Sequence, residues 1–291
     1  MTYHKPVLVE EVISFLAPRP GGVYIDVTFG GGGHTRAILQ AEPTCRVIAF
    51  DWDKDALEIN AAKIEEEFPG RIQFVWSNFS QLWRQLKKLN ITTVDGILAD
   101  FGTSQHQISH TKGLSFATNT PLDMRLSPSH QKITAAMLIN ELSEKELMEL
   151  FWHYGEERNA RPIVHAIAAA RAKKAITTTG ELAQIILSCS RQNRHSIHPA
   201  TRIFQALRIV VNKELDNINA FLSQAVPALK PHGRLVCISF HSLEDRLVKQ
   251  FFREQKALLN ILTQKVVIAR PEETAVNPSA RSARLRAAEK I

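Results

Sequence analysis

The sequence predicts an α/β fold in which a mostly parallel sheet with helices on both faces is interrupted by an all-helical insertion. Three observations predict it. Strand and helix patterns alternate up to about residue 100, no convincing strand pattern occurs between residues 105 and 205, and the alternation then resumes. Such alternation is typical of a parallel sheet that binds ligands at the carboxyl ends of its strands. We therefore expect one domain of residues 1–104 and 206–291 and an inserted subdomain of residues 105–205.

The first part of the sheet follows from short apolar runs separated by helical periodicity. The runs have the length of buried strands, and apolar positions three and four apart in the segments between them predict helices. The expected strands are residues 23–25, 46–50, 72–76 and 94–100, and the expected helices are residues 35–40, 56–67 and 80–89.

The insertion carries helix signals, and strand signals return only later in the chain. Ser143-x-x-Glu146 and Thr178-x-x-Glu181 have the spacing of capping boxes ahead of apolar helical runs. After the insertion we expect a helix over 201–224, a turn at 230–233, a strand over 234–240, a helix over 243–255 and a strand over 266–269. The basic stretch from Arg270 onward is either a loosely ordered, solvated tail or a basic strap that contacts phosphates.

Composition limits the class of protein. The chain has 291 residues, of which 44% are hydrophobic and 22% are charged, as expected of a globular protein with a full core. We expect no signal peptide, no membrane span, no disulfide and no metal site, because no apolar run is long enough and the three cysteines show no paired spacing. These features favour a cytoplasmic location. The net charge of +7 favours a polyanionic partner, RNA or DNA.

The segment from Asp26 to His34 is the most informative part of the sequence. It reads Asp-Val-Thr-Phe-Gly-Gly-Gly-Gly-His and lies between an expected strand and an expected helix, a geometry that brings backbone N–H groups and a helix N-terminus to a ligand. Asp51 ends the next expected strand, 21 residues after Gly30. An acid in that place typically binds the two hydroxyls of an adenosine ribose. The sequence therefore predicts a site for a nucleoside cofactor.

Two common nucleotide motifs do not fit this loop. A dinucleotide fingerprint needs a glycine three residues after Gly32, where Thr35 stands, and the lysine of a P-loop is absent. An acid with glycines four and six residues later, as in Asp26, Gly30 and Gly32, instead resembles the first motif of S-adenosylmethionine-dependent methyltransferases. Those enzymes usually carry a further glycine where this chain has Thr28.

Longer strings make the resemblance specific. In chain order they are residues 4–8, 26–34, 100–104, 113–116, 121–125, 154–158, 198–206, 239–246 and 277–282. Pro-Leu-Asp-Met-Arg, His-Pro-Ala-Thr-Arg and Phe-His-Ser-Leu-Glu-Asp-Arg are unusual strings, and the set covers essentially the whole chain. The sequence resembles the bacterial small-subunit rRNA cytosine-N4 methyltransferase family.

This resemblance implies a class I methyltransferase, Rossmann-like fold with a helical insertion on the substrate side. It implies S-adenosylmethionine as the cofactor, 16S rRNA or the small ribosomal subunit as the partner, and a cytidine of the decoding region as the target of rRNA processing. It further implies that two copies of the chain can associate as a homodimer. The cofactor-binding residues implied by motif position are Gly32, Gly33, His34, Asp51, Phe79, Asp100 and Gln107.

The catalytic residue stays open. Methyl transfer to the cytosine amine needs a hydrogen-bond acceptor, because the amine lone pair is conjugated with the ring. Asp100, Ser104 and His241 are candidates by location, whereas Asp26 is better placed to brace the glycine loop. A base that leaves its stack also needs aromatic and cationic neighbours. The matched strings offer Phe116, Arg125, Arg158 and Arg202 for that role.

Two rival functions need weighing. A methyltransferase for DNA amino groups would typically carry Asp/Asn/Ser-Pro-Pro-Tyr/Phe after the fourth strand, where this chain reads Asp100-Phe101-Gly102. A ribosome-assembly factor that binds RNA without transferring methyl groups would not be expected to keep the cofactor set of Gly32, Gly33, Asp51 and Asp100 together. Binding of S-adenosylmethionine discriminates between this last function and an active enzyme.

Overall fold

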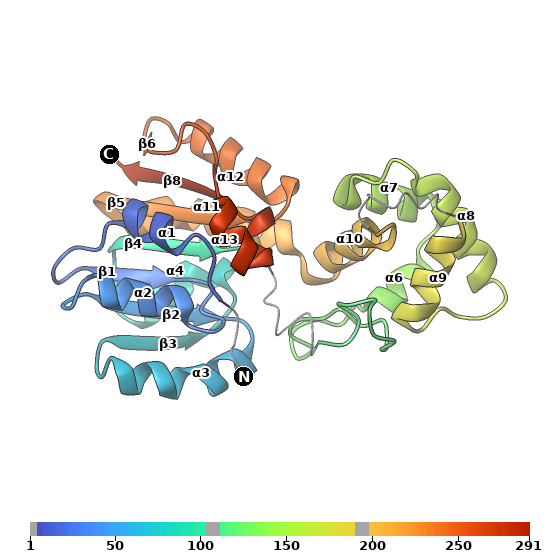
Figure 1. Cartoon of the computed structure of the whole chain (residues 1–291), viewed down its shortest axis with the longest axis horizontal. Helices are drawn as coiled ribbons and strands as arrows, with labels where there is room; N and C mark the ends of the chain where they lie inside the picture. The colour runs from blue at the N-terminus through green and yellow to red at the C-terminus, as the bar shows by residue number, and fades with distance from the viewer. Residues whose placement is uncertain (1–4, 103–110, 190–197) are drawn as a thin grey trace. The chain divides into compact units, whose positions relative to one another are not determined.

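The computed structural model describes residues 5–102, 111–189 and 198–291. The chain divides into an α/β unit of residues 1–104 and 215–291 and a helical unit of residues 105–214 (Figure 1). The second boundary follows Glu214 rather than residue 205, because helix α10 (Ala200–Asn212) packs its apolar face into the core of the helical unit. Among the helices of the described ranges, none has both the length and the apolar character that a bilayer crossing requires.

The α/β unit is built on an eight-stranded sheet with the order β3-β2-β1-β4-β5-β8-β6, in which β7 also pairs with β8. The strands are β1 (Val23–Asp26), β2 (Arg46–Asp51), β3 (Ile72–Trp76), β4 (Val94–Asp100), β5 (Leu229–Ser239), β6 (Leu259–Ile261), β7 (Val267–Ile268) and β8 (Arg284–Lys290). Strands β1 to β5 are parallel, and β8 is antiparallel to its neighbours. The chain builds outward from β1 to β3 and then returns to β4, so the topological switch point lies between β1 and β4.

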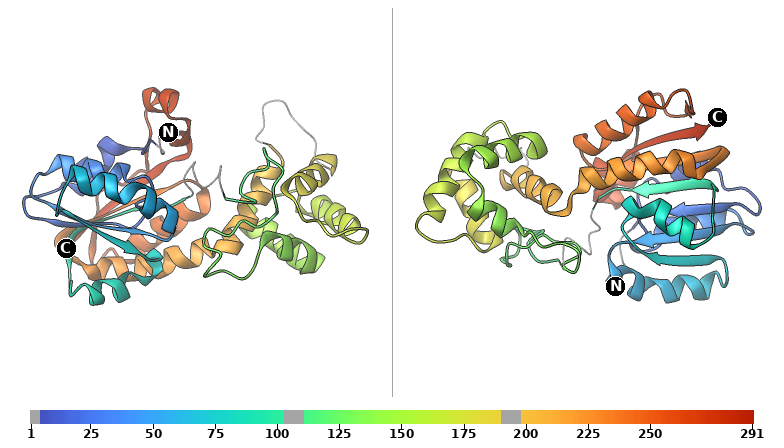
Figure 2. Two further views of the ribbon diagram at one scale, coloured as in Figure 1. Left: turned by 90° about the horizontal axis from the view of Figure 1, so that it is seen from below. Right: turned by 180° about the vertical axis from the view of Figure 1, so that it is seen from behind.

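Helices cover both faces of this sheet (Figures 1 and 2). One face is covered by α1 (Val9–Leu16), α2 (Gly33–Ala41) and α3 (Lys54–Glu67), and the other by α4 (Leu82–Lys88), α11 (Glu214–Ala228) and α12 (Ser242–Glu254). Successive strand residues point to opposite faces. Tyr24 therefore packs in the cluster of α1 to α3, and Ile25 packs in the cluster of α4, α11 and α12.

The helix expected over residues 201–224 is two helices. Lys213 separates α10 from α11 with a left-handed backbone (φ 52°), which ends the helix although the apolar pattern continues. The expected turn at 230–233 lies inside β5, where His232 also has a positive φ of 61° and the pairing with β4 shifts register. Helix α1 was not expected from the sequence, and its buried residues are Val12 and Leu16.

The stretch from Arg270 onward is not the loosely ordered tail that was one of its two expectations, and its contact with phosphates stays a prediction. After α13 (Pro271–Val276) and the 3₁₀ turn η2 (Pro278–Ser282), β8 lies inside the sheet between β5 and β6. Leu285 and Ala287 are buried, and the buried Arg286 donates to both carboxylate oxygens of Asp245 at 2.7 and 3.0 Å. Arg286 is therefore neutralised within the protein by an acid 41 residues away in the sequence.

The helical unit has its own apolar core. Its other helices are α6 (Ala135–Glu141), α7 (Glu144–Gly155), α8 (Ala160–Arg171) and α9 (Thr179–Cys189). The expected capping boxes are confirmed, because Ser143 and Glu146 bond each other's backbone N–H groups, as do Thr178 and Glu181.

Candidate active site

The glycine loop joins β1 to α2 at the carboxyl edge of the sheet. Gly30 and Gly32 have positive φ values of 51° and 73°, and Gly32 is the N-cap of α2. A Cβ on Gly32 would lie 2.9 Å from the Phe29 ring, and one on Gly33 would lie 2.7 Å from Cγ of Pro6. Both positions therefore require glycine. No side chain of the described residues caps α2, so the N–H groups of its first turn are available to a ligand.

Asp26 braces this loop from below. Its side chain is fully buried, and it accepts hydrogen bonds from the Thr28 backbone N–H at 3.1 Å and from the Thr35 hydroxyl at 2.7 Å. Burial raises the pKa of Asp26, although His34 and these donors oppose the shift. The bracing role expected for Asp26 matches these contacts.

His34 and Asp100 meet at the switch point between β1 and β4. His34 Nε2 lies 3.4 Å from Asp100 Oδ2, and both side chains are largely shielded from solvent. Burial alone would lower the pKa of His34, but Asp100 and Asp26 outweigh it and raise that pKa. Among the described residues, neither ring nitrogen of His34 nor Oδ1 of Asp100 has a hydrogen-bond partner. Buried polar atoms normally have one, so these atoms are available to a bound molecule.

Asp51 closes β2 beside the same loop. Its Oδ2 accepts from the Gly30 N–H at 2.6 Å and its Oδ1 accepts from the Asp53 N–H at 2.8 Å. Burial raises the pKa of Asp51 to about 7, against the lowering effect of these two donors. Each carboxylate oxygen has a second lone pair, so Asp51 can still accept hydrogen bonds from a pair of hydroxyls.

Asn60 was missed by the sequence analysis. Its buried side-chain amide donates to the Gly30 carbonyl at 3.1 Å and to the Ala56 carbonyl at 2.9 Å, so that α3 supports the glycine loop. No motif marks this residue, because its role depends on how α3 lies against the loop. Only its place on the apolar side of a helix, where an asparagine is unusual, could have indicated it.

Phe79 starts the 3₁₀ turn η1 (Phe79–Gln81) directly after β3. Its half-buried ring packs against the rings of Phe101 and Phe221, with centroids 5.8 and 5.7 Å away. These are the contacts of a core aromatic, and the expected contact with adenine stays a prediction. Gln107 and Ser104 lie outside the described residues.

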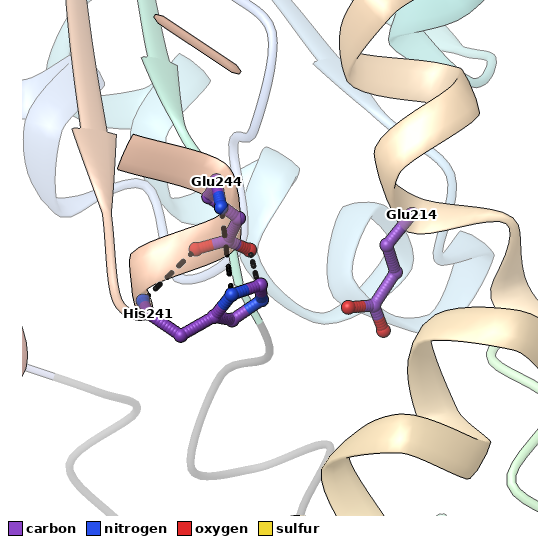
Figure 3. A group of neighbouring side chains, drawn as sticks. All are labelled: Glu214, His241 and Glu244. Atoms are coloured by element: carbon purple, nitrogen blue, oxygen red, sulfur yellow. Dashed lines mark hydrogen bonds and ion pairs between the residues drawn. The ribbon is translucent and has the colours of Figure 1, made fainter. Parts of the chain in front are cut away.

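His241 is the N-cap of α12, at the carboxyl end of β5 (Figure 3). Its Nδ1 accepts from the Glu244 backbone N–H at 3.5 Å, and its Nε2 lies 3.2 Å from Glu244 Oε1. The buried Glu244 in turn accepts from the backbone N–H groups of Phe240 and His241, which completes a capping box. His241 thus uses Nδ1 in the cap, whereas its Nε2 faces Glu244 without a hydrogen-bond partner among the described residues.

The four residues expected to bind the substrate differ in how they are held. Phe116 stacks on His198 with ring centroids 4.5 Å apart. Arg125 is fully engaged, because it bonds both carboxylate oxygens of Asp123 and the carbonyl of Gln131.

The other two arginines of this set are exposed. The contacts of Arg202 with the described residues are long, 3.5 Å to the Glu156 carbonyl and 3.8 Å to the Glu157 carboxylate. Arg158 has no ion pair within the described residues. The roles of all four residues in binding the substrate stay predictions.

The strand order, the glycine loop after β1 and the acids that end β1, β2 and β4 define a class I methyltransferase. The fold class expected from the sequence is confirmed. The chain belongs to the MraW methylase family, whose family model matches residues 1–291.

Two relatives are similar over nearly their whole length. Ribosomal RNA small subunit methyltransferase H of Thermomicrobium roseum is 48% identical over 309 residues, which cover 100% of this chain and 94% of that protein. The protein of the same name from Nostoc punctiforme is 48% identical over 291 residues, with coverage of 99% and 94%.

Proposed function

We propose that this protein transfers the methyl group of S-adenosylmethionine to the N4 amine of a cytidine in the decoding region of 16S rRNA. One observation carries the proposal. The helix N-terminus at Gly33, the carboxylate of Asp51 and the pair of His34 and Asp100 are intact at the switch point of a chain that is 48% identical to a ribosomal RNA small subunit methyltransferase.

These residues fit S-adenosylmethionine. The N–H groups of Gly33 and His34 would bind its methionine carboxylate, and Asp51 would accept from the ribose hydroxyls. The ring nitrogens of His34, which have no hydrogen-bond partner among the described residues, would bond to the polar groups of the methionine part. When bound, the cofactor supplies a methyl group that its sulfonium already activates.

The protein's own contribution is mainly positioning. Holding two reactants in line can account for several kcal/mol, about 7 or more, of the barrier. The amine also needs an acceptor that holds its proton as the new bond forms. Neutral His241 has no free lone pair, because accepting at Nδ1 puts its proton on Nε2, which faces Glu244. Asp100, with Oδ1 unbonded within the described residues, is the acceptor we propose.

The helical unit is the proposed site of RNA recognition. Its exposed arginines Arg158 and Arg202 and the stacked pair of Phe116 and His198 supply the cations and aromatic faces that a single-stranded RNA segment binds. The net charge of +7 favours the same partner. A cytoplasmic location, which the cysteine usage and the lack of a long apolar run favour, and a homodimer, which follows from the family resemblance alone, belong to this proposal.

Methyl transfer from labelled S-adenosylmethionine to small ribosomal subunits that lack the modification tests this proposal. The RNA is digested and the labelled nucleoside is identified by mass spectrometry. We expect N4-methylcytidine from the decoding region. Label on another nucleoside would overturn the assignment of the target atom. Binding of cofactor and RNA without any transfer to naked 16S rRNA or assembled subunits would favour the assembly factor.

A further inference from the structure

A cleft of about 900 Å³ lies between α12 and the edge of the sheet formed by β6 and β8. Phe252, Leu259 and Ile261 form its apolar part, and the exposed amides of Asn260 and Gln264 lie at its border. None of the residues assigned above to the cofactor lines it. The proposed methyl transfer gives this cleft no role.

Three cations of α12 and of the turn that follows it line one wall of the cleft. Lys249 and Arg253 are four residues apart and share one face of α12, and Lys256 lies in the turn just after the helix ends at Glu254. All three are exposed, and no carboxylate of the described residues lies within ion-pair distance of any of them. The described residues that line the cleft include no aspartate or glutamate. Arg286, the remaining cation, is already neutralised by Asp245.

The cleft lies toward the amino ends of the parallel strands, whereas the cofactor residues lie at their carboxyl ends. Strand β6 pairs with residues 288–290 of β8, and residues 288 and 289 of β8 pair with Arg234 and Leu235 at the start of the last segment of β5. Helix α12 leaves the carboxyl end of β5 and runs back toward the amino ends of the strands (Figure 1). Asp26, Asp51 and Asp100, in contrast, all end their parallel strands.

We propose that this cleft binds the sugar–phosphate backbone of the RNA substrate at a point remote from the methylated base. The inference rests on the proposed function, because it takes RNA as the substrate. Lys249 and Arg253 are four residues apart, about 6 Å along the helix axis, and Lys256 follows beyond the end of the helix. A single phosphate group does not reach both ends of this row, whereas successive phosphates of a strand do. Ribose rings can pack on the apolar part of the cleft, and the two amides can bond to hydroxyl or phosphate oxygens.

The variant Lys249→Gln/Arg253→Gln/Lys256→Gln tests the cleft. Its matched control is Arg84→Gln/Lys87→Gln/Lys88→Gln, which removes one arginine and two lysines from the exposed surface of α4. We expect the Kd for 16S rRNA and the KM for RNA to rise about tenfold in the cleft variant, and the salt slope of log Kd to fall by about two. The kcat and the Kd for S-adenosylmethionine should stay unchanged, and the control should change RNA affinity less than about threefold.

Three outcomes would overturn the inference. An equal loss in both variants would indicate general attraction to the net charge, and no loss in the cleft variant would leave the cleft without RNA. If inorganic polyphosphate or free nucleotides bound in the cleft and RNA did not compete with them, the cleft would be a site for small molecules. The wild-type protein is measured first, because failure to bind or methylate RNA at all refutes the proposed function instead.

Lysine acetylation of the unmodified protein gives an answer that is independent of whether the variant folds. The reagent is added with and without 16S rRNA, and modification is read by mass spectrometry. RNA should protect Lys249 and Lys256 several-fold and leave Lys87 and Lys88 reactive. Equal reactivity of Lys249 and Lys256 with and without bound RNA would contradict the proposal.

Discussion

The α/β unit and the helical unit hold their candidate functional residues in opposite ways. At the glycine loop, Asp26 and Asp51 are bonded to backbone N–H groups before any ligand arrives, and Asn60 supports the loop from α3. In the helical unit, Arg158 and Arg202 are exposed and loosely held. A small cofactor needs donors and acceptors fixed in advance, whereas RNA phosphates can be reached by long, solvated side chains. Substitutions in the two units should therefore have separable effects.

The largest effect is expected from Gly32→Ala. The new Cβ would be 2.9 Å from Phe29 at a positive φ, so the loop must shift away from the cofactor. We expect kcat/KM to fall at least about 100-fold, because a shift of about 1 Å costs that much in positioning. Gly70→Ala is the control, since Gly70 has a similar φ of 69° but nothing within 4 Å of its Cβ position. Equal activity of the two variants would show that the glycine loop is not part of the site.

Asp100→Asn separates a role in catalysis from a role in cofactor binding. The amide keeps the shape of the side chain but is a poor proton acceptor, so kcat should fall about 100-fold if Asp100 holds the proton of the amine. The Kd for S-adenosylmethionine, measured by calorimetry, should change by less than about threefold. A loss confined to cofactor affinity would assign Asp100 to the cofactor alone and leave Ser104 as the remaining acceptor.

The pKa of Asp51 predicts how cofactor affinity depends on pH. With a pKa of about 7, the carboxylate that accepts from the ribose hydroxyls is mostly protonated at pH 6 and mostly ionised at pH 8. The Kd for S-adenosylmethionine should therefore be about tenfold weaker at pH 6 than at pH 8. Without cofactor, the stability of the α/β unit depends on pH in the opposite direction. A raised carboxyl pKa stabilises the α/β unit at low pH, and this stabilisation is lost as the pH rises toward 7.

The matched control for this pH effect is Asp51→Asn. His34 also has a raised pKa and could contribute, so the variant must lose the pH dependence and not merely the affinity. A pH profile unchanged in Asp51→Asn would assign the titration to His34 instead.

A smaller effect is expected in the helical unit, where Arg202 and Arg125 should respond differently. Arg202→Ala should raise the KM for RNA about three- to tenfold without a change in stability, because its contacts within the protein are long and exposed. Arg125→Ala should lower the free energy of unfolding of the helical unit by about 1 kcal/mol, since it leaves Asp123 unpaired. Thermal melts and methylation kinetics of both variants, with and without RNA, compare the two. If Arg125→Ala raised KM without a loss of stability, its ion pair would be secondary to a contact with RNA.

Most of the cofactor site at the carboxyl ends of the strands could be predicted, because acids that end strands and glycine turns are local signals. Asp26, Asp51 and Asp100 each follow a recognisable apolar run, and parallel strands bring their carboxyl ends to one edge. The break at Lys213 could not be predicted, because an ordinary lysine adopts a left-handed conformation within a continuous apolar pattern. Strand β8 was missed for a related reason. Its sequence Arg-Leu-Arg-Ala-Ala-Glu-Lys alternates between polar and apolar residues only over its first four positions, and Arg286 is buried only because Asp245 on α12 pairs with it.

The insertion of the helical unit between β4 and β5 also has a consequence for the order of folding. Parallel pairing of Asp100 with Ile238 must wait until residues 105–214 have been synthesised. Contacts of such long sequence separation form slowly, whereas the helical unit is continuous in sequence and has its own apolar core. On a nascent chain, the helical unit can therefore become compact while β4 still lacks its neighbour β5. Chaperones should then bind mainly to folding intermediates in which the sheet is incomplete.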